Sequence, residues 1–136
     1  MEPSQEYQEQ LIKLRYLKEQ RDMLQGQLEI VNASLGNVIN TKNTIENLKE
    51  GVKEDDEILV PIGGLVNIKA SIKDPEKVLL AVTQDVVIEK DLDGANEYLD
   101  KIIEKINQQI QFITTQIRNI DVNLQVISQN FQKGYT

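Results

Sequence analysis

The stretch that decides the fold runs from residue 58 to residue 90 and reads ILVPIGGLVNIKASIKDPEKVLLAVTQDVVIEK. It is rich in Val, Ile and Leu, and three groups of turn-forming residues interrupt it: Gly63-Gly64, the Asp-Pro turn at 73–77, and 83–85. The pattern predicts four strands, at 58–62, 65–72, 78–82 and 86–88, which form two hairpins.

These strands favour assembly with other chains. Pro61 has no N–H and cannot occupy a central hydrogen-bonded position. Small hairpins are marginal in water, and unpaired edges beside Val/Ile-rich faces call for partner strands. In the second segment Val66, Ile68, Ala70 and Ile72 alternate with polar residues. We therefore predict an oligomerisation module whose apolar contacts come from Val60, Ile62, Val66, Ile68, Ile72, Leu80, Val82, Val86 and Ile88.

A heptad repeat over residues 4–50 predicts a long coiled-coil helix before the strands. Pro3-Ser4 is its expected start and Gly51 its expected left-handed stop, while Gly26 and Gly36 weaken it. Nine of the twelve seam positions are apolar, the seam being Tyr7, Gln10, Leu14, Leu17, Arg21, Leu24, Leu28, Val31, Leu35, Val38, Lys42 and Ile45.

A second heptad helix, over residues 92–132, follows the strands. Asp91 is its expected N-cap, and Gly94 is a small liability in the first turn. All ten seam positions are apolar: Leu99, Ile103, Ile106, Ile110, Ile113, Ile117, Ile120, Leu124, Ile127 and Phe131.

The two seams match as an intrachain antiparallel coil. Opposed residues in such a coil have a constant sum of residue numbers, and here the sums are 144, as for Val31 with Ile113, or 145, as for Leu14 with Phe131. Pairing of each helix with another chain is the alternative, but it does not explain this register.

Several apolar residues lie off the seams, toward the end of the coil that both chain ends form. They are either ordinary exposed apolar side chains or an adaptable binding surface. Phe131 is ambiguous, because it can also close the seam against Leu14. Phe112 and Ile102 are candidates for packing against a neighbouring subunit. As binding candidates we take Leu11, Ile12, Tyr16, Met23, Val122, Val126 and Phe131.

The composition excludes several classes of binding partner and of catalytic chemistry. The net charge of −7 argues against nucleic acid, whose phosphates need clustered Lys and Arg. Without Cys or His there are no thiol nucleophiles, disulfides, Cys/His zinc sites or histidine acid–base chemistry. The polar N-terminus and the lack of a long apolar run predict a cytoplasmic protein that does not engage membranes.

The acidic run Glu54-Asp55-Asp56-Glu57 is the remaining place for catalysis. Paired carboxylates do acid–base work only where their environments separate their pKa values. A contiguous run between a helix and a strand is more typical of a solvated linker with, at most, weak cation binding. No cofactor or metal is predicted, and we expect no enzyme.

In the order of its motifs the chain resembles the alpha class of the prefoldin family. The resemblance rests on Leu59-Val60-Pro61-Ile62-Gly63, on the turn from Lys73 to Val78, on Val87-Ile88-Glu89-Lys90, and on Ala95 and Tyr98. Thr83 and Gly94 depart from the usual residues. The order helix, four strands, helix matches the alpha class, whereas beta-class subunits carry one hairpin; the small size is similar to that of archaeal members.

The resemblance implies an α+β fold: a single domain, 1–136, with an antiparallel coiled-coil helical hairpin and two central β-hairpins that join a β-barrel platform. It implies a hexamer of two alpha-type and four beta-type subunits. The expected function is that of an ATP-independent holdase, whose coil tips capture unfolded proteins and pass them to a group II chaperonin. The alternative is a structural scaffold or a filament-forming relative, in which open contacts give filaments rather than a closed complex.

Overall fold

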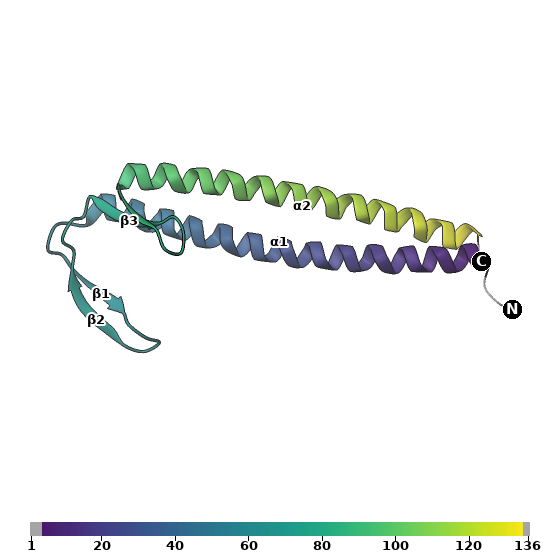
Figure 1. Cartoon of the computed structure of the whole chain (residues 1–136), viewed down its shortest axis with the longest axis horizontal. Coiled ribbons are helices and arrows are strands. Elements are labelled where there is room, and N and C mark those ends of the chain that lie inside the picture. The colour runs from purple at the N-terminus through teal and green to yellow at the C-terminus, as the bar shows by residue number, and fades with distance from the viewer. Residues whose placement is uncertain (1–3, 135–136) are drawn as a thin grey trace. The chain divides into compact units, whose positions relative to one another are not determined.

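The computed structural model describes residues 4–134 and contains two long helices separated by four short strands (Figure 1). This confirms the predicted α+β fold with two β-hairpins. The elements, in chain order, are α1 (Gln5–Gly51), β1 (Glu57–Pro61), β2 (Asn67–Ser71), β3 (Lys77–Ala81), β4 (Val87–Asp91) and α2 (Leu92–Gly134).

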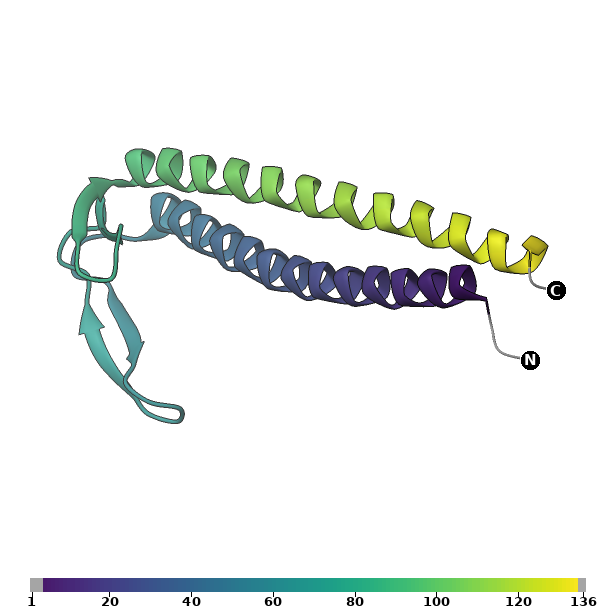
Figure 2. The ribbon, with the colours of Figure 1, turned by 45° about the vertical axis from the view of Figure 1, so that its right-hand side comes forward.

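The chain forms two compact units. The coil unit combines Met1–Leu35 with Lys105–Thr136, and the hairpin unit is Gly36–Glu104. Within each unit the segments of α1 and α2 lie side by side and run in opposite directions (Figures 1 and 2). The intrachain antiparallel pairing expected from the two heptad seams is therefore present in both units.

The core of the coil unit consists of seam residues alone. Leu24, Ile113 and Ile117 are buried. The side chains that pack against these three are Leu28, Val31 and Ile120, so the predicted partners lie in one cluster. Farther along the unit, the rings of Tyr7 and Phe131 meet edge to face, with centroids 5.3 Å apart and planes at 87°. Phe131 thus has an aromatic partner that the predicted pairing with Leu14 did not include.

The hairpin unit has its own core, to which strands as well as helices contribute. Its buried members are Ile45 of α1 and Leu92, Ala95 and Leu99 of α2. Partly buried side chains of Val38, Leu48, Val78, Leu80 and Ile102 pack against them. Ile102, a candidate for contact with a neighbouring subunit, therefore packs within its own chain.

Ion pairs account for two of the polar residues in the α1 seam. Arg21 Nε lies 2.5 Å from Asp121 Oδ1 in the coil unit, and Lys42 Nζ lies 2.5 Å from Asp100 Oδ1 in the hairpin unit. In each pair the seam cation of α1 reaches an acid that flanks the seam of α2. The hydrogen bond to Asp121, followed by its charge, raises the pKa of Arg21. The seam thus tolerates a cation where the opposite helix supplies a carboxylate at its edge.

A third pair joins Lys49 of α1 to Asp93 in the first turn of α2. Its hydrogen bond raises the pKa of Lys49 above the ordinary lysine value. A raised lysine pKa means that the folded state binds the proton more tightly, so this contribution is complete at neutral pH. It is lost only as the pH rises above the ordinary lysine pKa and through the raised one.

The buried Asn96 is a polar member of the hairpin unit that the seam pattern did not single out. It is 8% exposed, and its amide Nδ2 donates to Glu46 Oε1 at 2.6 Å. Its Oδ1 is buried without a partner among the described residues. A buried amide inside an apolar seam is costly unless the helices keep the register that supplies its partner. Asn96 therefore favours this one alignment of α1 and α2.

The two hairpins repeat the same ladder twenty residues apart. In the first, Glu57 pairs with Ser71 and Pro61 with Asn67; in the second, Lys77 pairs with Asp91 and Ala81 with Val87. In the first hairpin the N–H of Ile62 donates to the carbonyl of Val66 at 2.9 Å, and in the second the N–H of Val82 donates to the carbonyl of Val86 at the same distance. The carbonyl of Val86 also accepts the N–H of Thr83 at 3.3 Å. The closing residues lie in the turns, beyond the regular strands.

The second turn departs from the glycine that the family resemblance suggests, and the structure shows what replaces it. Thr83 Oγ1 accepts the backbone N–H of Val86 at 3.1 Å. A threonine hydroxyl can close a turn in this way without a positive φ. Both hairpins are consequently formed with turns of the same length.

Several predicted boundaries need correction. The second strand is shorter than 65–72 and the fourth is longer than 86–88. Six residues predicted to lie in strands fall outside them. Five of these lie in the turns, where the regular ladder has ended, namely Ile62, Leu65, Val66, Val82 and Val86, and Ile72 lies just beyond the last ladder pair, Glu57 with Ser71.

The predicted left-handed stop at Gly51 is wrong. Helix α1 does end at Gly51, but no glycine among the described residues has a positive φ. The left-handed residue is Asp55, with φ of 69°, and its N–H donates to the carbonyl of Ile72 at 2.8 Å. Asp56 Oδ2 closes the same turn on the N–H of Lys53. The chain reverses there because Asp tolerates the left-handed region better than most residues.

Both helix starts are capped as predicted. Ser4 Oγ accepts the N–H of Tyr7 at 3.1 Å, while Pro3 lies outside the described residues. Asp91 Oδ1 accepts the N–H of Gly94 at 2.7 Å. A Cβ on Gly94 would lie 2.7 Å from that oxygen. Gly94, expected to be only a liability, therefore leaves room for the cap.

We expect Gly36→Ala to stabilise the chain. Gly36 lies inside α1, and a Cβ there would meet nothing within 4 Å. Alanine should therefore raise the free energy of unfolding by about 1 kcal/mol. Thermal unfolding followed by circular dichroism measures the change, with Gly26→Ala as the counterpart in the coil unit. An unchanged or lower melting temperature for both variants would contradict the assignment of these positions as open helix surface.

Candidate assembly and binding surfaces

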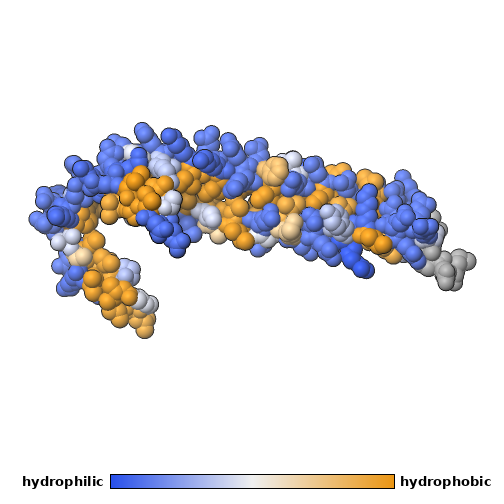
Figure 3. All heavy atoms as spheres, in the orientation of Figure 1, coloured by the Kyte–Doolittle hydropathy of each residue, from blue (hydrophilic) through white to orange (hydrophobic). Residues whose placement is uncertain are grey.

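The β1–β2 hairpin presents an apolar face that its own chain leaves uncovered. Opposed residues share a face, so Ile58 and Val60 lie beside Ala70 and Ile68. Neither strand contributes a side chain to the two core clusters. Figure 3 shows apolar surface gathered over this hairpin. The exposed large side chains here are Ile58, Leu59, Ile62, Leu65, Val66 and Ile68, with Leu65 97% exposed.

The equivalent face of the β3–β4 hairpin is partly used within the chain. Val78 and Leu80 correspond to Ile58 and Val60 through the twenty-residue repeat, and both pack against the core of the hairpin unit. Leu80, predicted to contribute to assembly, therefore also packs within its own chain. Val82 and Val86, at the turn end of the same face, remain exposed. One hairpin is thus anchored and the other free at matching positions.

Three of the other predicted assembly residues are covered in part, and they belong to both hairpins. Val60 and Ile72 on the first hairpin and Ile88 on the second are partly covered. Ile88 pairs with Leu80 in the ladder, and Val60 pairs with Ile68. The free turn ends and the uncovered β1–β2 face are what remain for contact with another chain.

Six of the seven candidate binding residues on the coil are exposed. Ile12 is 68% exposed and Tyr16 59%, while Phe131 is half-buried against Tyr7. All seven belong to the coil unit. The structure therefore leaves these side chains available for a partner, with the exception of much of Phe131. The six exposed residues are Leu11, Ile12, Tyr16, Met23, Val122 and Val126.

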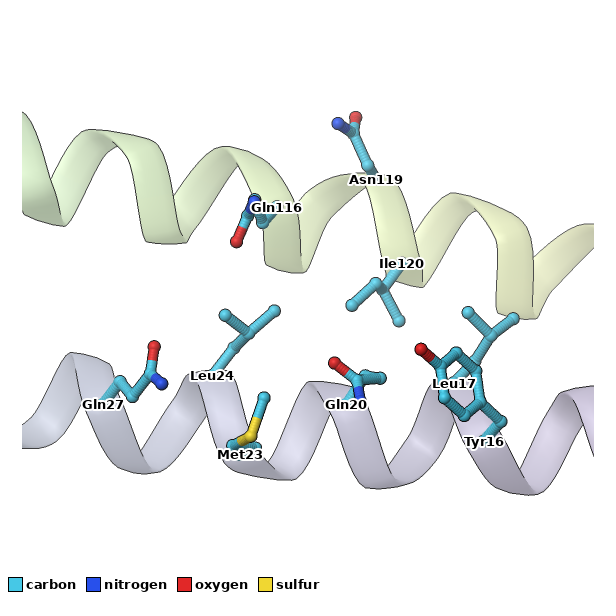
Figure 4. A pocket seen from close by; sticks show the side chains of 9 residues that line it. All are labelled: Tyr16, Leu17, Gln20, Met23, Leu24, Gln27, Gln116, Asn119 and Ile120. Carbon is cyan, nitrogen blue, oxygen red and sulfur yellow. The ribbon is translucent and has the colours of Figure 1, made fainter.

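Two grooves on the coil unit include residues that the heptad argument did not select. One, of about 510 Å³, is lined by nine residues, among them Tyr16, Met23, Leu24 and Ile120. Figure 4 shows Leu24 and Ile120 projecting into the space between the helices, whereas Asn119 projects away from α1. The second, of about 330 Å³, includes the exposed Ile30 and Phe112. A seven-residue spacing from Tyr16 through Met23 to Ile30 was the signal that could have identified Ile30.

The acidic run does not gather into a centre. Asp56 binds the backbone of Lys53, and Glu57 lies 3.9 Å from Lys69 across β1 and β2. Across residues 4–134 no group of three or more acidic side chains is placed to hold a metal ion. Nor is any helix in that range long and apolar enough to cross a membrane.

An antiparallel helical hairpin that carries two β-hairpins with an uncovered apolar face defines a class of assembling coiled-coil subunits. The family model described as "Prefoldin subunit" matches residues 17–136. The chain therefore belongs to the prefoldin family, as its motifs suggested.

Curated relatives in the same family are alpha subunits. The chain is 35% identical over 97 residues to prefoldin subunit alpha of Methanobrevibacter smithii, covering 71% of this chain and 65% of that one. It is 31% identical over 115 residues to the Methanococcus maripaludis (strain C5) protein, covering 85% and 77%. The Pyrococcus horikoshii protein is 32% identical over 106 residues, covering 75% and 72%.

A solved structure shares the fold. Filamentous PFD from Methanocaldococcus jannaschii superimposes with a TM-score of 0.75 at 19% identity, covering 85% of this chain and 95% of that chain. At this level of identity the likeness concerns the fold.

The twenty-residue repeat provides a matched test of the two hairpins. Leu80→Ala removes packing against the core of the hairpin unit and should lower the free energy of unfolding of the isolated chain by about 1–3 kcal/mol. Val60→Ala, at the equivalent position, which packs against neither core cluster, should cost less than about 0.5 kcal/mol. Chemical denaturation of the isolated chain measures both. Equal losses would show that the two hairpins are anchored alike.

Proposed function

We propose that this chain is a subunit of an ATP-independent chaperone, which assembles through its hairpins and captures non-native proteins on its coil unit. Membership of the prefoldin family implies a chaperone-type function. The observation that carries the proposal is the pairing of two separate surfaces in one chain: an uncovered apolar strand face and exposed apolar residues along a charged coil.

The strand face supports the assembly half of the proposal. Burying the β1–β2 face against strands of another subunit would remove exposed Ile58, Ile62 and Val66 from water, and apolar area contributes about 25 cal/mol per Å². The assembly we propose is a hexamer of two such chains with four beta-type subunits, whose hairpins form a closed β-barrel platform. Closure leaves no free strand edges.

The coil unit supports the capture half. Its exposed apolar residues are spread along the surface rather than gathered in one deep pocket, which suits partners that have no fixed shape. Several such coils in one assembly would combine weak contacts into useful avidity. We propose that captured proteins pass to a group II chaperonin in the cytoplasm.

A filament is the second candidate function. The structure that shares this fold is titled filamentous PFD from Methanocaldococcus jannaschii. The same uncovered strand face would form filaments if the contact between copies did not close on itself. A scaffold of that kind would need no beta-type partner.

Native mass spectrometry separates the two assemblies. The chain alone, and the chain co-expressed with a beta-type subunit, should be compared at the same concentration. We expect a closed mixed hexamer with the partner. Val60→Asp and Ile68→Asp should abolish it while leaving helicity intact, because a charge on this face would be buried unpaired. Long homopolymers from the chain alone, unchanged by the partner, would establish the filament instead.

Loss of exposed apolar side chains on the coil unit should weaken capture. The triple variant Leu11→Ser, Ile12→Ser, Val122→Ser removes three contacts, each of about 0.5–1 kcal/mol, and should raise the amount of complex needed to suppress aggregation by at least about tenfold.

Light scattering of a denatured client, measured with the assembled complex, checks this expectation. The matched control is Gln8→Ser, Asn32→Ser, Gln125→Ser, three exposed polar positions on the same unit. Equal protection by the triple variant and the control, with the assembly intact in both, would rule out these residues as capture sites.

A further inference from the structure

Two adjoining grooves on the coil unit are lined by no charged residue. The two grooves described above share Gln27 and Gln116, so their walls are continuous. Together they are lined by fourteen residues, none of them charged. Because 27% of the chain is charged, fourteen residues taken at random would include about four charges. We call the lining residues outside the seam the uncharged stripe: Tyr16, Gln20, Met23, Gln27 and Ile30 of α1, and Gln109, Phe112, Gln116 and Asn119 of α2.

A third groove on the same unit shows the contrast. It is lined by Leu11 and Leu14 together with Arg15, Lys18, Glu19 and Asp22. Four of its six lining residues are charged. The lack of charge is therefore a property of the two adjoining grooves rather than of every groove on the unit.

The stripe alternates large apolar side chains with amides. Tyr16, Met23 and Ile30 follow one another at seven-residue intervals on α1, and Ile30 and Phe112 are 70% and 64% exposed. Gln20 and Gln27 occupy the positions between them. Each amide offers both donors and an acceptor, the same groups that a peptide bond presents.

This spacing does not suit a further helix. A coiled-coil seam needs apolar residues at two positions in every seven, and here the second position on α1 is an amide. An extended segment fits better, because its side chains can contact the apolar residues while its unpaired peptide groups bond to the glutamines. A charged side chain laid in the stripe would lose water without meeting an opposite charge.

We infer that the uncharged stripe binds extended apolar segments of non-native polypeptides that lack charge, and discriminates against segments that carry acidic side chains. This inference rests on the proposed capture function and names the class of segment it takes.

The test uses the full chain in its assembled complex and three blocked, dye-labelled ten-residue peptides of Leu, Val, Ser and Gln. One probe is uncharged, one has two Ser replaced by Glu, and one has the same two replaced by Lys. Fluorescence anisotropy should show that the uncharged probe binds about tenfold more tightly than the Glu probe. Its Kd should change by less than about twofold between 50 and 500 mM salt, because no charge pair is screened.

The variant Gln27→Glu, Gln116→Glu adds two charges to the shared wall with little change of shape. It should weaken the uncharged probe about tenfold and shift preference toward the Lys probe. The matched control, Gln111→Glu with Gln125→Glu, adds the same charge at exposed positions of α2 outside both grooves and should leave the uncharged probe unchanged.

The outcomes separate the inference from the function on which it rests. If the wild-type complex suppresses aggregation but Gln27→Glu, Gln116→Glu and its control bind each probe with the same Kd, the stripe is not the site and the capture proposal stands. If Gln27→Glu, Gln116→Glu alters the oligomeric state without altering probe affinity, the stripe is an interface between copies and the inference is overturned. If the wild-type complex protects no client, the proposed function itself fails.

Discussion

Burial of a narrow row of Ile and Leu side chains between α1 and α2 is the interaction on which the rest of this structure depends. Each unit has only one such layer, and even the buried Ile45 and Ile127 remain 4% exposed. Two helices cover one another on a single side, so the apolar stripe has no second layer to support it. From Leu99 to Phe131 all ten seam positions of α2 are apolar, and that makes one layer sufficient.

The polar residues within the seams direct this contact rather than strengthen it. Arg21 and Lys42 would interrupt the α1 seam if nothing met them, but Asp121 and Asp100 lie at the edge of α2 where those side chains reach. Exposed pairs of this kind contribute little stability. Their value is that a shift of register by one turn would separate every pair and leave the amide of Asn96 buried without Glu46.

Which apolar surfaces stay exposed depends on which residues join the core of each unit. In the hairpin unit, Val78 and Leu80 join the helical core, whereas the equivalent residues of the first hairpin do not. The two hairpins therefore have the same strand pairing but pack differently against the helices. Only the second hairpin leads directly into α2, through Asp91 and Leu92. In the coil unit, a two-helix layer leaves both flanks of each helix in water, and the side chains that line two adjoining grooves there are all uncharged.

The heptad spacing by itself determined that two helices would pair antiparallel, and the alternation of apolar residues determined that two hairpins would connect them. Both repeats can be recognised in the sequence because backbone geometry sets the periods of helices and strands. The caps at Ser4 and Asp91 were equally local, since an oxygen three residues ahead of an N–H is within reach in any helix start. Only the tertiary structure decided that Leu80 would be anchored and Val60 left free, that Asp55 rather than Gly51 would take the left-handed turn, and that Tyr7 would meet Phe131. Each of these depends on which distant side chain or carbonyl arrives beside the residue, and the pattern of neighbours in sequence does not contain that information.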